Sequence, residues 1–198
     1  MRVSVSDVDA YRYYLASESM TLDEFLARLR RETPPTPAMA AGTAFHKFLE
    51  TSGPGELVDA KVDGIEFRFD LSADVALPDI RELKATKEYL IDGIAVELVG
   101  KVDAMSGYRV WDHKLTSRFD PERYADSFQW RAYLTILGAQ RFTYNVFTAY
   151  EDEAAGAWIV KGFDSLDFYR YPGMERDVAT QLTDFVRFVQ KHLPEKAA

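Results

Sequence analysis

Residues 96–117, which read VELVGKVDAMSGYRVWDHKLTS, restrict the fold and the chemistry of the chain more than any other stretch. Two strand-like runs meet at Ser106-Gly107, a pair typical of the tight turns that close β-hairpins. A turn at these two residues predicts that Asp103 lies opposite Val110 and that Lys101 lies opposite Asp112.

Alternate residues of a strand share a face, so this hairpin is predicted to have one charged face and one mostly apolar face. The charged face collects Glu97, Lys101, Asp103, Asp112, Lys114 and Thr116. The opposite face collects Leu98, Val102, Ala104, Trp111, His113 and Leu115. A hairpin that buries one face and concentrates acids and a lysine on the other indicates a functional site.

Length and composition predict one globular domain over residues 1–198, because this length can bury a sizeable core. Hydrophobic residues make up 47% of the chain and charged residues 28%, as in soluble proteins. The chain has no cysteine, which excludes disulfides and cysteine-held metal centres and fits a reducing cytosol. No basic-then-apolar leader opens it and no apolar run is as long as a bilayer is thick, so no membrane partner is expected.

The net charge of −8 argues against a protein that coats nucleic acid through charge alone. An enzyme that acts on DNA remains compatible with it, because metal-binding carboxylates are acidic and basic residues can cluster locally. The middle of the chain holds such basic residues, and we take Lys101, Arg118 and Arg131 as candidate nucleic-acid contacts. A solvated charged surface is the simpler interpretation of each of them alone.

The flanking sequence predicts an α/β fold with a central mixed sheet and helices around it. An antiparallel meander is expected over residues 56–116, with Asp63-Gly64 and Asp92-Gly93 as further hairpin turns and Glu88 opposite Glu97. Residues 72–86 give no clear pattern. Helices are expected from near Ser6 to Ala16, over 21–31, 38–51, 120–137 and 174–193, and two more strands over 141–150 and 155–163.

Asp112-x-Lys114 places a carboxylate and an ammonium on one strand face, with Asp103 diagonally across the hairpin. Hard divalent cations such as Mg²⁺ prefer carboxylate, carbonyl and water oxygens. A lysine beside such an ion could hold or deprotonate an attacking water, or offset charge as a phosphorane forms. The D-x-K spacing alone is common by chance, and an exposed strand that alternates acid and base is the better explanation of that spacing taken by itself.

Four motifs in order resemble the PD-(D/E)XK nuclease superfamily, and within it the RecB-like and phage-type exonuclease branch, whose fold has a restriction-endonuclease-like core. The resemblance covers about residues 4–137. The motifs are Gly42-Thr-Ala-Phe-His46, Gly100-Lys-Val-Asp103, Asp112-His-Lys114 and Gln129-Trp-Arg-Ala-Tyr133. Each is weak alone, and their order on a predicted helix, a hairpin and a second helix carries the resemblance.

The resemblance implies a Mg²⁺- or Mn²⁺-dependent DNA nuclease, with exonuclease favoured over endonuclease action, in recombination, repair or phage DNA processing. Lys114 would be the catalytic lysine, and Gln129 and Tyr133 would line the site and position the lysine or a DNA phosphate. The metal would be held by Asp103, Asp112, His46 and the backbone carbonyl of His113, with Glu97 as a further candidate. The side chain of His113 itself is expected to point to the apolar face and to be structural.

The sequence departs from that pattern in three ways. Many relatives in the branch hold an iron–sulfur cluster through cysteines, which this chain lacks, and Asp112 stands where many have Glu. The helicase domains of RecB-like enzymes are also absent, so a self-standing nuclease in the cytosol of a bacterium or of a phage-infected cell fits better. A recombination or single-strand-annealing partner protein and a homo-oligomer are further options that the resemblance raises.

Two alternatives remain open from the sequence. The first is a nucleic-acid-binding or assembly module with the same fold and a degenerate site, against which the intact Asp103, Asp112 and Lys114 argue. The second is another metal-dependent phosphodiesterase that matches the pattern by coincidence.

Overall fold

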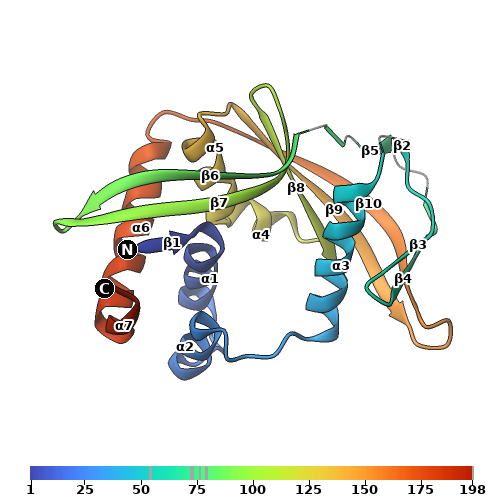
Figure 1. Ribbon diagram of the computed structural model, residues 1–198, viewed down its shortest axis with the longest axis horizontal. Helices are drawn as coiled ribbons and strands as arrows, with labels where there is room; N and C mark the ends of the chain where they lie inside the picture. The colour runs from blue at the N-terminus through green and yellow to red at the C-terminus, as the bar shows by residue number, and fades with distance from the viewer. Residues whose placement is uncertain (54, 72–73, 76, 79, 198) are drawn as a thin grey trace.

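The structure is a computed structural model that describes residues 1–53, 55–71, 74–75, 77–78 and 80–197. One mixed sheet of eight strands organises it, in the order β1-β7-β8-β9-β10-β4-β3, with β6 on the other edge of β7 (Figure 1). These strands are β1 Arg2–Ser4, β3 Ala60–Val62, β4 Ile65–Phe69, β6 Ile80–Ile91, β7 Ile94–Ser106, β8 Arg109–Thr116, β9 Arg141–Asp152 and β10 Ala157–Tyr169. Three neighbouring pairs, β1–β7, β8–β9 and β4–β10, are parallel and the others are antiparallel. The predicted central mixed sheet flanked by helices is therefore confirmed.

The two faces of the sheet are covered by different helices. The helices are α1 Val5–Ala16, α2 Leu22–Arg30, α3 Pro37–Thr51, α4 Pro121–Asp126, α5 Phe128–Leu137, α6 Met174–His192 and α7 Pro194–Ala197. Strand β9 alternates between two cores: Tyr144 and Val146 pack with α1, α2, α5 and α6, whereas Phe147 and Ala149 pack with α3. Figure 1 shows α3 apart from α1 and α6, joined to α2 by the connector that follows Arg30.

The predicted meander is correct only in part. Strands β6, β7 and β8 do form an antiparallel series. The hairpin β3–β4 does not continue it, because β4 pairs in parallel with β10 at the far edge of the sheet. Short strands β2 (Gly55–Glu56) and β5 (Asp74–Val75) form a separate two-stranded sheet, and residues 72–73, 76 and 79 of the ambiguous segment lie outside the described residues.

The register of the hairpin formed by β7 and β8 differs from the prediction. The turn occupies Gly107 and Tyr108, so Ala104 pairs with Trp111 and Ser106 with Arg109. Gly107 has a φ of 54°, which a glycine adopts at little cost, and this favours it as the first central residue of the turn. The shift by two positions keeps the predicted faces but moves Asp112 opposite Asp103 instead of Lys101. The neighbouring hairpin is as predicted, with Glu88 opposite Glu97.

The helix predicted over 120–137 is wrong as one element, because it breaks at Ser127 into α4 and α5. Ser127 ends α4 and its hydroxyl accepts from the backbone N–H of Gln129, so it also caps α5. The Arg131 guanidinium donates to the carbonyls of Ala125, Asp126 and Ser127 and thereby satisfies the end of α4. The break therefore places Gln129 in the first turn of α5.

The remaining helices begin and end close to the predicted bounds. The Thr21–Glu24 capping box of α2 is confirmed. Helix α1 begins at Val5 and is capped by Ser4. The short strand β1 that precedes it was not predicted from the sequence. Among the described helices, none is both long and apolar enough to cross a membrane.

Candidate active site

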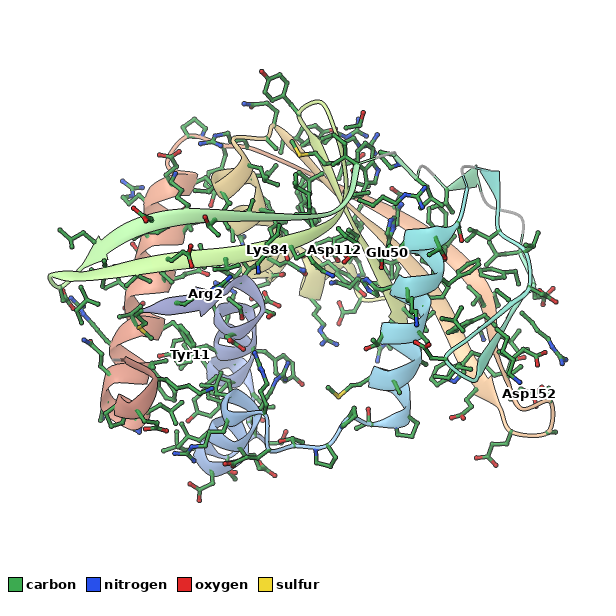
Figure 2. The ribbon with its side chains drawn as sticks, viewed as in Figure 1. Arg2, Tyr11, Glu50, Lys84, Asp112 and Asp152 are labelled. Atoms are coloured by element: carbon green, nitrogen blue, oxygen red, sulfur yellow. The ribbon has the colours of Figure 1, made fainter. Side chains whose placement is uncertain are left out.

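Asp103 and Asp112 lie where two strands separate. The registered pairing of β7 with β8 ends at Ala104–Trp111, and the two aspartates are the next residues along each strand. The Asp103 carboxylate accepts a hydrogen bond from the backbone N–H of His113 at 2.6 Å. The Asp103 side chain thus takes the place of a backbone acceptor and holds the two strands together where their backbone pairing ends. This point lies in the centre of the molecule, where Figure 2 labels Asp112.

One edge of strand β7 has no strand partner between Val99, where its pairing with β1 ends, and Ala104, where its pairing with β8 begins. Tyr133 of α5 fills this gap. Its hydroxyl donates to the carbonyl of Lys101 at 2.8 Å, and its ring covers Gly100 so closely that an added Cβ would lie 2.9 Å from Tyr133 Cδ1 and closer still to Cε1. Gly100 is therefore required by the packing of Tyr133, which gives a physical reason for the glycine in the second motif.

Substituting Gly100 with alanine is expected to lower the free energy of unfolding by about 1–3 kcal/mol, because the new methyl group overlaps the buried Tyr133 ring. Gly42→Ala in helix α3 is the matched control: no atom lies within 4 Å of its Cβ position, and alanine favours a helix over glycine by about 0.5–1 kcal/mol. Urea denaturation of both variants measures the difference. Equal stability of Gly100→Ala and wild type would contradict the packing argument.

Asp112 is 2% exposed and has partners on two sides. Lys114 Nζ lies 2.5 Å from its Oδ2, and the Gln129 amide donates to its Oδ1 at 2.7 Å. The Lys114 contact lacks hydrogen-bond geometry, so Oδ2 has no hydrogen-bond partner among the described residues. Lys114 also lies 5.8 Å from the ring centroid of Tyr144. A buried carboxylate oxygen with unused acceptor capacity is suited to bind a cation or water.

His46 extends from helix α3 into the site, and its Nδ1 lies 3.2 Å from Asp103 Oδ2. Arg81 of β6 holds the end of that helix, because its guanidinium donates to the carbonyls of Leu49, Glu50 and Ser52. These carbonyls lack partners within the helix, so one arginine satisfies the C-terminus of α3 and fixes it to the sheet. The sequence indicated His46 but not Arg81, which stands in the segment without a clear pattern.

A second set of residues missed by the sequence positions Gln129. Asp9 of α1 accepts hydrogen bonds from the Ser127 hydroxyl and the Phe128 N–H, both at 2.7 Å. The buried Tyr144 hydroxyl donates to Ser127 at 3.1 Å and lies 3.4 Å from the Gln129 amide oxygen. Helix α1 is thereby joined to the amide that contacts Asp112. Only the break at Ser127 could have revealed this role, and the local pattern favours a continuous helix.

The two carboxylates have different proton affinities. Burial alone would raise the pKa of Asp103, but the hydrogen bond and charge of His46 lower it to about 2. Burial and the nearby charge of Asp103 raise the pKa of Asp112 to about 6, although Lys114 opposes this. Burial would lower the pKa of Lys114, whereas the charges of Asp112 and Asp103 raise it above its usual value, so Lys114 is a cation at neutral pH.

The other predicted site residues lie elsewhere or have other partners. Glu97 pairs with Arg2 at 3.3 Å beside β1, and Lys101 pairs with Glu82. The guanidinium of Arg131 is engaged at the end of α4, and Arg118 is exposed on the loop after β8. The His113 ring lies 6.5 Å from the Phe147 ring, in the core on the α3 side, and burial lowers its pKa to about 4.

No group of three or more His, Asp or Glu side chains among the described residues is arranged to hold a metal ion. The donors at the site nevertheless fit Mg²⁺, which is commonly bound through one or two carboxylates with the remaining positions taken by water and phosphate oxygens. Asp103 and Asp112 supply two carboxylates, and Asp112 Oδ2 lies beside the Lys114 ammonium without a hydrogen bond, so it keeps acceptor capacity for an ion.

Comparison with known proteins gives a likeness in fold alone. No family model and no curated protein matches the chain. The crystal structure of SSO0001 matches with a TM-score of 0.54 at 14% identity, over 96% of this chain and 76% of that one. LHK-Exo, an alkaline exonuclease from Laribacter hongkongensis, matches with a TM-score of 0.47 at 14% identity, over 99% of this chain and 93% of that one. Its complex with dAMP gives 0.46, also at 14% identity, over 98% and 92%.

Proposed function

We propose that the protein is a Mg²⁺- or Mn²⁺-dependent DNA nuclease of the PD-(D/E)XK superfamily that hydrolyses phosphodiester bonds, with exonuclease action favoured by the RecB-like and phage-type resemblance. The observation that supports this most is the position of Asp103, Asp112 and Lys114 together at the separation of β7 and β8, with His46 and Gln129 against the two carboxylates. These residues stand in all four motifs, and the fold brings them to one place from β7, β8, α3 and α5.

In the proposed reaction a water oxygen forms a bond to phosphorus and loses a proton, while the bond from phosphorus to the 3′ oxygen breaks and that oxygen takes up a proton. The products are a 5′-phosphate and a 3′-hydroxyl. A divalent ion bound by the two aspartates, with His46 and the His113 carbonyl as the further proposed ligands, would lower the pKa of a bound water and neutralise phosphate charge. Lys114 would offset the negative charge that develops on the phosphoryl oxygens.

The raised pKa of Lys114 favours a cationic role over that of a base for the attacking water. Gln129 would keep Asp112 turned toward the site through its 2.7 Å hydrogen bond, and Tyr133 would fix β7 at Lys101. DNA is the proposed substrate. A recombination or single-strand-annealing partner and a homo-oligomer stay predictions from the resemblance.

The experiment that tests this function is degradation of end-labelled linear DNA and closed circular DNA, each single- and double-stranded, with Mg²⁺, Mn²⁺ or a chelator. We expect metal-dependent degradation of linear DNA and none with chelator. Cleavage of linear but not circular DNA supports an exonuclease, and cleavage of both supports an endonuclease. If no DNA is cleaved under any of these conditions, the proposed function is wrong, and hydrolysis of only non-nucleic phosphodiesters would support the alternative enzyme.

A further inference from the structure

A cleft of about 590 Å³ opens beside Lys114, between α1, α2, α4, α5 and β8. Lys114, Gln129 and Tyr144 belong to its lining, so the cleft reaches the candidate active site directly. Tyr13 and Arg28 of the first two helices and Arg123 of α4 also line it. A volume of this order suits one small ligand, and thus about one or two nucleotides of a single strand.

The cleft is locally basic although the chain carries a net charge of −8. Its lining holds the basic residues Arg12, Arg28, Lys114 and Arg123 and the acidic residues Asp9 and Asp126. Both acids are already engaged, since Asp126 pairs with Arg12 and Asp9 accepts from Ser127 and Phe128. Within the described part of the chain, Arg28 and Arg123 have no carboxylate partner, so their charges are available to an anionic ligand.

The same cleft holds an exposed aromatic ring. Tyr13 is 48% exposed, and the guanidinium of Arg123 lies 5.4 Å from its ring centroid. A nucleobase stacks on aromatic rings and on arginine guanidinium groups regardless of its identity, and arginine charges contact the phosphates on either side. An exposed tyrosine beside Arg123, in a cleft that Arg28 also lines, is therefore suited to a single polynucleotide strand.

We propose that this cleft binds single-stranded DNA, with one base stacked on Tyr13 and backbone phosphates held by Arg28 and Arg123, on the path that leads to Lys114. This inference rests on the proposed function and specifies the form of the substrate. Tyr13 and Arg123 lie outside the four motifs, and neither Tyr13 nor Arg28 is among the sequence-predicted contacts.

The test measures binding without cleavage, by fluorescence anisotropy of a labelled oligothymidylate of about 12 nucleotides in the presence of chelator. We expect Tyr13→Ala to weaken binding by about 5- to 150-fold, which corresponds to loss of one base stack, and Tyr13→Phe to bind as wild type. Tyr108→Ala is the matched control, because Tyr108 is 72% exposed at the turn between β7 and β8. Equal binding by Tyr13→Ala and Tyr108→Ala would overturn the proposal.

Two further measurements separate stacking from charge. An abasic strand of the same length should bind wild type as weakly as the normal strand binds Tyr13→Ala, and equal binding of abasic and normal strands would overturn the stacking role. Arg28→Gln should reduce the dependence of log affinity on log salt concentration by about 0.7, as expected for one lost phosphate contact with a single strand. An unchanged slope would overturn the role of Arg28.

The outcome is independent of the nuclease assay. Tyr13-dependent binding without any cleavage would support the cleft and contradict the proposed function. Metal-dependent cleavage with binding that is insensitive to Tyr13 would support the function and overturn the cleft proposal. Circular dichroism spectra of the variants ensure that each comparison is between folded proteins.

Discussion

Replacing Lys114 with methionine is expected to lower metal-dependent DNA cleavage by about 10²–10³-fold, the loss typical when one preorganised electrostatic contact to a transition state is removed. Methionine keeps the apolar length of the side chain but removes the ammonium that lies 2.5 Å from Asp112 Oδ2. The loss should appear in the rate of the chemical step, measured under single-turnover conditions with labelled linear DNA and Mg²⁺.

Lys84→Met is the matched control. Lys84 is an exposed lysine on strand β6, where it pairs with Lys101 of β7, and Figure 2 labels it in the same region of the sheet as Asp112. We expect it to cleave as wild type. Lys114→Arg keeps the positive charge in a larger group and should recover part of the activity if charge is what matters. Wild-type rates in Lys114→Met would contradict the assigned role of this lysine.

Replacing Asp103 with asparagine is expected to abolish cleavage and also to destabilise the metal-free protein by on the order of 2 kcal/mol. The pKa of Asp103 is lowered to about 2 mainly by His46, so the folded state favours its charged form, and this stabilisation is present at neutral pH. Asparagine retains an acceptor for the His113 N–H but loses the charge opposite His46. For a chain of this length the melting temperature should fall by about 4–8 °C.

Asp63→Asn controls for the loss of a negative charge on the surface. Asp63 is exposed and pairs with Lys47, an arrangement worth about 0–1 kcal/mol. Melting curves recorded in chelator at pH 7.5 or nearby should show a clear fall for Asp103→Asn and little change for Asp63→Asn. If the two variants have the same melting temperature, Asp103 does not have the partners that the structure gives it.

The sequence predicts most of the residues that meet at the candidate site, because the patterns that indicate these residues are local. The D-x-K spacing on β8 and the Asp-Gly turn between β6 and β7 depend on strand alternation and turn chemistry, which short segments reveal. The β7–β8 hairpin shows the limit of such local patterns. Gly107 fits a turn with either neighbour, and only the observed pairing, which ends at Ala104 and Trp111, brings the next residues Asp103 and Asp112 together.

The parts that could not be predicted depend on contacts between distant segments. The break at Ser127 is stabilised by Asp9, which lies more than a hundred residues earlier in the chain. Arg81 donates to three carbonyls at the C-terminal end of α3, including that of the capping residue Ser52, and no pattern of side chains in the sequence predicts such backbone acceptors. Gly100 also depends on a distant contact, because the ring of Tyr133 leaves no room for a side chain at this position. The hairpin therefore indicates the chemistry, whereas the surrounding helices determine its geometry.

The central claim is that Asp103 and Asp112 bind a divalent cation beside Lys114, and Mn²⁺ binding measured by electron paramagnetic resonance tests it most directly. Titration of Mn²⁺ into wild-type protein should show saturable loss of the free-ion signal, Mg²⁺ should restore that signal by competition, and Asp103→Asn should bind far more weakly than Asp63→Asn. Wild-type protein that leaves the free Mn²⁺ signal unchanged, or Asp103→Asn that binds as wild type, would contradict the account.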